Sequence, residues 1–227
     1  MLINDCPNFV GKGELFHLQG NGNQRPDGSK AWRKDDLVQA LERMRDAWGS
    51  RTIAFKVFPG HIPPRLIKTE LLPRDDIAFA LLKRRPIESF VSGVKVKGGA
   101  NYALMDTTDI KPAISADDFL VWARRTRAWY KWIRGVLDAR EKPYAEISFE
   151  KHLDGYSAQE SLAHLRELFS PLGITNFEDV DEHATGGMRQ DRQGDYRKRV
   201  ANWDAFEAAL RARPQTRNML KWAERIP

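Results

Sequence analysis

The sequence has few of the residues and patterns that mark several large classes of protein. Its 227 residues include a single cysteine, Cys6, so no disulfide can form within the chain. No apolar run approaches the length of a bilayer span, and no basic segment followed by an apolar core opens the chain. Internal repeats, low-complexity tracts and zinc-ligand spacings of cysteine and histidine are all absent. We therefore expect a soluble, cytoplasmic protein without a metal centre.

The composition suits a globular chain with a bias toward anionic partners. Hydrophobic residues make up 41% of the sequence, and the mean hydropathy is −0.57. The length is enough for one sizeable domain, which we expect to span residues 1–227. The net charge is +6 and the isoelectric point is about 9.5, which favours nucleotides, phosphosugars, acidic glycans or nucleic acid as partners.

One stretch, Ile77–Lys97, organises the rest of the chain. An unbroken apolar run over residues 77–82 predicts a strand that is buried on both faces. Basic residues follow, and then Pro86, which suits the first turn of a helix because the amide there has no partner within the helix. Glu88 would lie in that first turn, where the helix dipole favours an acid. The sequence therefore predicts a strand, a tight basic turn and a helix.

Such a turn can hold an anion. A helix start beside Arg84 and Arg85, followed by the hydroxyls of Ser89 and Ser92, offers charged donors and free backbone amides. Basic residues at strand ends are also common on solvated surfaces, and this alternative stays open on the stretch alone.

The pattern Arg84-x-Pro86-x-x-x-x-x-Ser92 after an apolar strand resembles the segment with which sulfotransferases bind 3′-phosphoadenosine 5′-phosphosulfate (PAPS). The resemblance implies that Arg84 and Ser92 hold the 3′-phosphate of this co-substrate. It also implies an α/β fold with a parallel sheet flanked by helices, similar to that of P-loop nucleoside triphosphatases. The reaction implied is transfer of a sulfuryl group to a hydroxyl, on a carbohydrate in the bacterial and carbohydrate-directed members.

Two further segments of the first half resemble the same family. The stretch Cys6–His17 is similar to a segment in which an acid serves as the catalytic base of some bacterial members, and Glu14 takes its position. His61 follows the expected strand Thr52–Phe58, where cytosolic sulfotransferases carry a catalytic histidine. Four residues separate Lys56 from His61, a wider spacing than in the family, so a plain loop histidine is the competing interpretation.

The second half adds weaker similarities. Phe149-Glu150-x-x-Leu153 resembles a segment that follows a strand in the family, and Ser157-x-x-Glu160 predicts a capping box that opens a helix. The basic loop His183–Arg199 resembles the loop that closes over the nucleotide, with Arg189 and Arg192 as candidate ligands. Helices are also expected from residue 34 to Gly49 and from residue 115 to about residue 140.

One part of the family pattern has no counterpart. Sulfotransferases bind the 5′-phosphosulfate with a Gly-Ser/Thr loop after their first strand, and no segment of this sequence matches that loop. The resemblance therefore implies a chain that is truncated at its N-terminus, through a late start or as a fragment. A degenerate homologue that binds without transfer, or a false resemblance, would give the same pattern.

Three functions follow from these observations. The first is a sulfotransferase that uses PAPS and a small-molecule or glycan acceptor, with little activity in this chain. The second is a non-catalytic protein that binds a nucleotide or sulfated ligand. The third is an RNA-binding protein that uses the basic face of residues 124–134, although such a face is more often solvated, so nucleic acid is not the expected partner.

Overall fold

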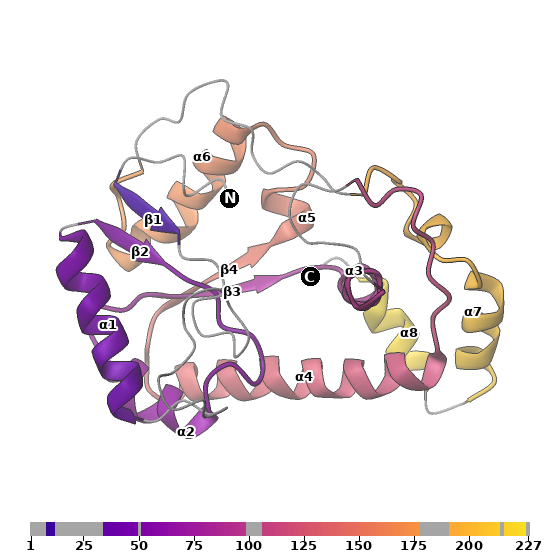
Figure 1. Cartoon of the computed structure of the whole chain (residues 1–227), viewed down its shortest axis with the longest axis horizontal. Helices are drawn as coiled ribbons and strands as arrows, with labels where there is room; N and C mark the ends of the chain where they lie inside the picture. The colour runs from indigo at the N-terminus through magenta and orange to yellow at the C-terminus, as the bar shows by residue number, and fades with distance from the viewer. Residues whose placement is uncertain are drawn as a thin grey trace. The chain divides into compact units, whose positions relative to one another are not determined.

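The computed structural model describes residues 8–11, 34–49, 51–98, 106–177, 191–213 and 216–225 as a mixed α/β protein (Figure 1). The chain divides into two compact units, each assembled from separate stretches of sequence. Unit 1 comprises Met1–Leu81, Trp132–Ala145 and Tyr156–Gly186, and unit 2 comprises Leu82–Lys131, Glu146–Gly155 and Gly187–Pro227. None of the described helices combines the length and the apolar content that a membrane crossing requires.

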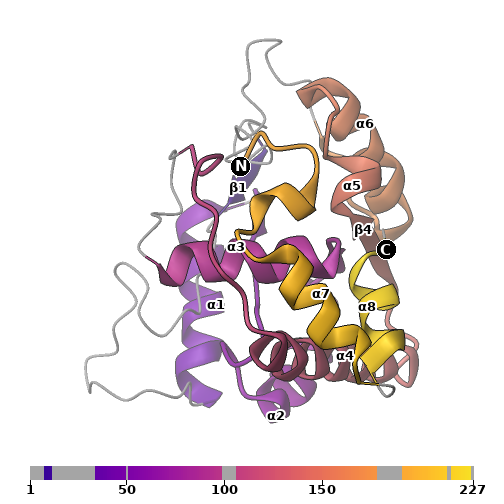
Figure 2. The same ribbon diagram turned by 90° about the vertical axis from the view of Figure 1, so that its right-hand side faces the viewer.

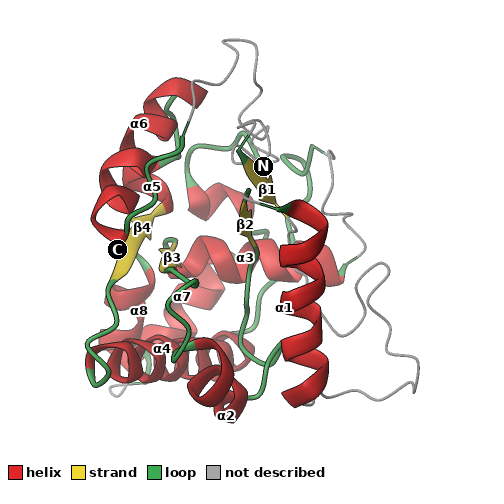
Figure 3. Cartoon of the chain, turned by 90° about the vertical axis from the view of Figure 1, so that its left-hand side faces the viewer, coloured by secondary structure: helices red, strands yellow, loops and turns green. Residues whose placement is uncertain are grey.

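Unit 1 contains a short parallel sheet and the helices around it. Its elements are β1 (Phe9–Gly11), α1 (Lys34–Trp48), β2 (Thr52–Ala54), α2 (Pro64–Leu66), the π-helix η2 (Ile67–Leu71), α6 (Ala158–Phe169) and the 3-10 helix η3 (Ser170–Leu172). Strands β1 and β2 lie side by side, with Phe9 opposite Thr52 and Gly11 opposite Ala54 (Figure 3). The ring of Phe9 packs against that of Phe177, with 4.6 Å between their centroids.

The helices of unit 1 follow from their sequence patterns. Leu37, Leu41 and Met44 recur at helical spacing on α1, and all three side chains are buried. The helix ends at Gly49, whose φ of 59° lies in the left-handed region that glycine tolerates. On α6, Ser157 and Glu160 form the predicted capping box, in which the two residues bond each other's backbone amides. These sequence predictions are therefore confirmed.

A second pair of strands contributes to both units. Strand β3 (Phe79–Lys83) pairs with β4 (Tyr144–Ser148), and the two arrows run in the same direction (Figure 1). Lys83, the last residue of β3, forms an ion pair with Glu146 in the middle of β4. Among the described residues, the strands form two two-stranded sheets, β1–β2 and β3–β4. The mixed α/β class with parallel strands is therefore confirmed at this coarse level.

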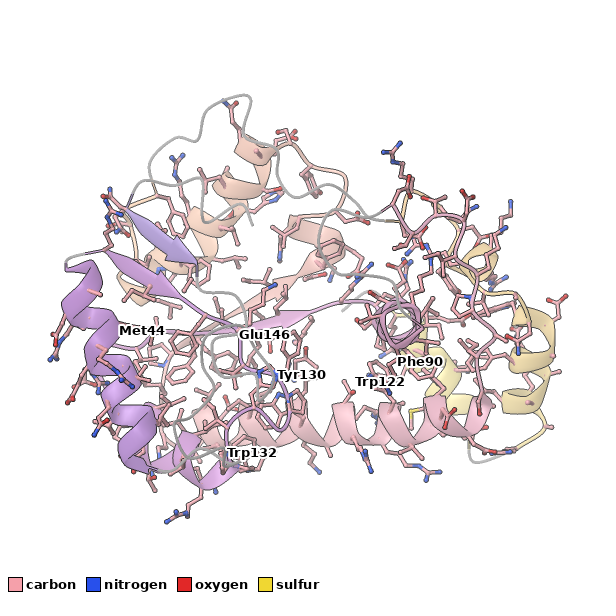
Figure 4. The ribbon with its side chains drawn as sticks, viewed as in Figure 1. Met44, Phe90, Trp122, Tyr130, Trp132 and Glu146 are labelled. Atoms are coloured by element: carbon pink, nitrogen blue, oxygen red, sulfur yellow. The ribbon has the colours of Figure 1, made fainter. Side chains whose placement is uncertain are left out.

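The helices of unit 2 pack around one hydrophobic core. The unit holds α3 (Pro86–Lys97), most of α4 (Ala116–Asp138), α5 (Phe149–His152), the 3-10 helix η4 (Tyr196–Arg199), α7 (Trp203–Arg211) and α8 (Arg217–Ala223) (Figure 2). Phe90 of α3 points toward Trp122 of α4 (Figure 4), with 5.5 Å between the ring centroids. Phe119 packs edge-on against both Phe90 and Phe206, which joins α3, α4 and α7.

Some elements differ from the sequence predictions. The expected strand over residues 52–58 is reduced to β2, and Lys56 beyond it is exposed. Strand β3 is not buried on both faces, because Leu82 is 43% exposed while Leu81 is buried. The faces of a strand are covered by elements that pack on the sheet and not by its strand partner, so an apolar run does not by itself show that both faces are covered.

Candidate anion-binding site

The candidate site begins where β3 ends and α3 begins, both in unit 2. Pro86 occupies the first helical position, as predicted, and Arg85 is the residue before it. The backbone amide of Arg85 donates to Glu150 Oε1 at 2.6 Å, so a carboxylate from α5 covers the start of the helix. The helix ends at Lys97, with Gly98 as the residue after it. The strand, basic turn and helix therefore occur in the predicted order.

Three guanidinium groups converge on the carboxylate of Glu88. Its side chain is only 2% exposed and lies in the first turn of α3. Arg85 Nη1 donates to Glu88 Oε1 at 2.6 Å, while Arg84 Nη2 and Arg199 Nη1 each lie 3.4 Å from Oε2. A single carboxylate therefore holds the side chains of two neighbouring residues and one from η4.

Each of these three arginines has one buried nitrogen without a hydrogen-bond partner in the described structure. The unpaired atoms are Nε of Arg84, Nε of Arg85 and Nη2 of Arg199, and all three are buried within the described structure. A buried donor left unpaired costs about 1–3 kcal/mol. An oxyanion that reached these nitrogens would recover that free energy through charge-assisted hydrogen bonds.

Aromatic rings fix the orientation of two of the guanidinium groups. Arg84 lies over the ring of Phe149, 4.8 Å from its centroid, and Arg85 lies 5.2 Å from the ring centroid of Tyr196. Burial raises the pKa of the Tyr196 hydroxyl, and its hydrogen bond to Glu224 raises the pKa further. Tyr196 therefore stays protonated and donates to Glu224 at 2.8 Å.

A second carboxylate, Asp191, ties the segment before η4 to α3. Asp191 Oδ2 accepts a hydrogen bond from Lys95 Nζ at 2.7 Å and lies 3.6 Å from Arg199 Nε. Lys95 is 4% exposed, and its Nζ also donates to the carbonyl oxygen of Thr107 at 2.7 Å. Arg199 Nε donates to the carbonyl oxygen of Gln193 at 2.7 Å. Asp191 therefore joins Lys95, a buried cation of α3, to Arg199, a buried cation of η4.

The local charge is slightly positive. Four cations, Arg84, Arg85, Lys95 and Arg199, contact three acids, Glu88, Glu150 and Asp191, through the bonds described above. Two further buried atoms without a partner lie on the β4 side, namely the Ser148 hydroxyl and Glu150 Oε2. A ligand that combines an anionic group with hydroxyls would match this mixture of donors and acceptors.

The residues predicted from the family pattern have different environments. Ser92 lies one helical turn after Glu88 on α3, so the spacing places both on the helix face that Arg84 contacts. Ser92 is half-buried, and no hydrogen bond joins it to Arg84 in the described structure. Glu88, between them in sequence, is the residue that Arg84 contacts. The predicted convergence of Arg84 and Ser92 on one phosphate stays a prediction.

Arg192 is placed away from Glu88. Its Nε lies 3.6 Å from Asp106 Oδ2, its backbone amide donates to Thr108 Oγ1 at 3.0 Å, and its side chain is 69% exposed. Thr108 in turn donates its amide to Asp106 Oδ1. Arg192 therefore joins the segments around residues 106 and 191. Two other predicted residues, Glu14 and Arg189, lie outside the described residues.

His61 belongs to unit 1. Its side chain is 9% exposed, and its ring lies edge-on to Phe58, with 5.3 Å between the ring centroids. Its backbone amide donates to the carbonyl oxygen of Phe58 at 3.1 Å, which closes a turn after the segment of β2. A buried ring packed on an aromatic side chain agrees with a structural role, and its catalytic role stays a prediction.

Sequence reasoning missed Arg199, the most buried cation of the site. Arg199 is the last residue of the basic loop that resembles the nucleotide-covering loop of the family, but only Arg189 and Arg192 were chosen there as candidate ligands, because no pattern in the loop marks one arginine as buried. Glu88 was expected where the helix dipole favours an acid, and its contacts with Arg84 and Arg85 are local, whereas its contact with Arg199 joins residues far apart in sequence.

Comparisons with known proteins add no relative, since no family model, curated protein or solved structure matches this chain. In the part of the chain that the structure describes, no group of three histidine, cysteine or acidic side chains is arranged to hold a metal ion. The functional argument therefore depends on the arginine cluster itself.

Proposed function

We propose that this protein is sulfotransferase-like and binds the 3′-phosphate of PAPS at the arginine cluster of Arg84, Arg85 and Arg199. The observation that supports this proposal is that each of the three guanidinium groups holds Glu88 with one nitrogen and keeps another buried nitrogen unpaired. Ser92, one turn further along α3, is the fourth candidate ligand.

Physical chemistry favours a phosphate at this position. The cluster lies at the N-terminal end of a 12-residue helix, where the dipole stabilises negative charge. Guanidinium groups bind phosphate oxygens through paired, charge-assisted hydrogen bonds. The unpaired oxygen of Glu150 would instead accept a hydroxyl hydrogen, as acids do with ribose in other nucleotide sites.

The reaction proposed is transfer of the sulfuryl group to a hydroxyl of a carbohydrate acceptor. The acceptor oxygen forms a new bond to sulfur, while the bond between sulfur and the phosphate oxygen of PAPS breaks. A base, Glu14 or His61, takes the acceptor proton, and adenosine 3′,5′-diphosphate leaves with the negative charge. Positioning and charge stabilisation provide most of the catalysis in such transfers. Because no segment matches the phosphosulfate loop, we expect this chain to transfer slowly.

The test is a calorimetric titration with adenosine 3′,5′-diphosphate and with adenosine 5′-monophosphate, which lacks the 3′-phosphate. We expect the wild-type protein to prefer the diphosphate. Arg84→Gln should weaken diphosphate binding by about tenfold to hundredfold and leave the monophosphate affinity unchanged. Arg140→Gln, an exposed site in unit 1, is the matched control. Equal affinity of the wild-type protein for both nucleotides would refute the proposal.

A non-catalytic ligand-binding protein is the second candidate. It is favoured by the burial of the three unpaired nitrogens, since a cluster held by Glu88 can bind an anion without any transfer machinery. The two candidates separate in an assay that follows labelled sulfate from PAPS to a mixture of carbohydrate acceptors. Tight binding of adenosine 3′,5′-diphosphate without any labelled product selects the non-catalytic protein, whereas labelled product selects the transferase.

A further inference from the structure

We infer that the exposed flank of α4 next to α8 binds single-stranded RNA. Residues 119–137 contain five cations, Arg124, Arg125, Arg127, Lys131 and Arg134, and no aspartate or glutamate. An ordinary solvated helix face interleaves both signs of charge, because pairs three or four residues apart stabilise the helix. Arg124, Arg125, Arg127 and Lys131 have no acid three or four residues away on this helix, so their charge is available to an external anion.

Three of these basic residues, Arg124, Arg127 and Lys131, line one hollow on the surface of unit 2. The hollow is lined by Arg124, Arg127, Ala128, Lys131 and Met219. Arg124 and Lys131 are exposed and have no ion-pair partner in the described structure. They lie seven residues apart on the helix, so they are separated by about 10 Å along its axis. Two unneutralised cations therefore border the hollow at a spacing that an extended phosphate backbone can follow.

The floor of the hollow favours a nucleobase as the second recognised group. Ala128 and Met219 of α8 also line the hollow, and the Met219 thioether, which accepts a hydrogen bond from Arg127 Nη1 at 3.8 Å, is a group that makes favourable contacts with aromatic rings. Arg127 is held on this side, 5.6 Å from the ring centroid of Trp222. A sulfated polysaccharide has no aromatic ring to contact the methionine, and an anionic membrane would require large apolar side chains among the lining residues. Single-stranded RNA offers both the charge and the rings.

This surface is distinct from the arginine cluster around Glu88. The lining residues belong to α4 and α8, and none of them contacts Glu88 or Asp191. RNA binding here would be a further activity beside the proposed nucleotide site, and either can fail without the other.

The test is fluorescence anisotropy with a labelled oligouridine of roughly 12 nucleotides, in about 50 to about 200 mM salt. With three phosphate contacts, from Arg124, Arg127 and Lys131, the affinity of the wild-type protein should fall by about 20-fold over this range. The double variant Arg124→Gln/Lys131→Gln keeps one contact, and its affinity should fall by only about threefold. Lys56→Gln/Lys68→Gln removes the same charge from exposed positions of unit 1 and should behave as wild type.

Three results would overturn the inference. The first is the absence of binding at the lower salt concentration, and the second is an unchanged salt dependence in the double variant. The third is displacement of the RNA by heparin or by polyglutamate at the same charge concentration, together with equal direct binding of those polymers. Circular dichroism should match between variants and wild type, because the substituted side chains are exposed.

Discussion

Arg199 Nη1 lies 3.4 Å from Glu88 Oε2, and both side chains are almost completely buried, at 3% and 2% exposure. The two residues belong to η4 and α3, so this ion pair joins the C-terminal part of unit 2 to the start of the helix after β3. Burying two charges is costly unless further hydrogen bonds compensate them. Here Arg84 and Arg85 on one side and Asp191 and Gln193 on the other provide those bonds.

Glu88→Gln should therefore destabilise the protein strongly. The substitution leaves three guanidinium groups facing a neutral amide, and removing one partner of a buried ion pair costs about 3–5 kcal/mol. Urea unfolding followed by circular dichroism would measure the loss. Glu207→Gln is the matched control, because the Glu207–Arg211 pair of α7 spans a helical turn with an exposed arginine and contributes about 0.5 kcal/mol or less. An equal decrease in the free energy of unfolding for both variants would show that the buried ion pairs of Glu88 stabilise the protein no more than an exposed ion pair does.

Lys95→Met tests the contact between Lys95 and Asp191, the second acid that pairs with Arg199. The ammonium of Lys95 donates to Asp191 and to the carbonyl oxygen of Thr107, so methionine would leave both acceptors with fewer partners. We expect the free energy of unfolding to fall by about 2 kcal/mol or more, with increased proteolysis near residues 107 and 191. Lys97→Met changes an exposed lysine of the same helix and should alter neither property. A Lys95→Met protein as stable as wild type would contradict the assignment of Lys95 as a link between segments.

Phe90→Ala tests the packing of α3 on α4. Phe90 is 6% exposed, and its ring packs edge-on against Phe119 at 5.3 Å between centroids. Removing a buried ring from such a core costs about 3–5 kcal/mol, which urea unfolding would detect. Val121→Ala removes atoms from a side chain that is 47% exposed and should cost less than about 1 kcal/mol. A small loss for Phe90→Ala would indicate that the two helices do not share one core.

Local signals in the sequence predicted the start of the site well. Within a helix, proline is tolerated in the first turn, which places Pro86 at the helix start. Glu88, three residues after Arg85, lies where the dipole favours an acid, so the turn and the helix followed from local backbone chemistry. The same is true of α1, where apolar spacing and Gly49 set the helix and its end. These predictions succeeded because each depends on neighbours within a few residues.

The contacts between distant segments could not be predicted in this way. Arg199 contacts Glu88 because η4 packs near α3, and nothing in the sequence around residue 199 distinguishes a buried arginine from an exposed one. The prediction that both faces of β3 are buried was wrong for a related reason. The apolar run of β3 matched a doubly covered strand, but its exposure depends on which strands and helices lie beside it, and Leu82 remains exposed.

The capping box of α6 gives a prediction for acid pH. Glu160 accepts hydrogen bonds from the backbone amide and the hydroxyl of Ser157, and these bonds lower the pKa of its carboxyl below the ordinary value of 4.5. A carboxyl whose pKa is lower in the folded state binds its proton more readily when unfolded. Its contribution to stability is therefore complete above pH 4.5 and is lost as the pH falls through the lower, folded-state pKa.

Glu160→Gln should remove this part of the acid sensitivity. Glutamine can still accept the bond from the Ser157 amide, so stability at neutral pH should stay close to that of wild type. Between neutral pH and pH values below 4.5, the stability of the variant should decline less steeply than that of wild type, as thermal unfolding across this range would show. Ser157→Ala, which removes the cap itself, should instead cost about 1 kcal/mol at neutral pH. Parallel pH profiles for Glu160→Gln and wild type would show that Glu160 has the same pKa in the folded and unfolded protein.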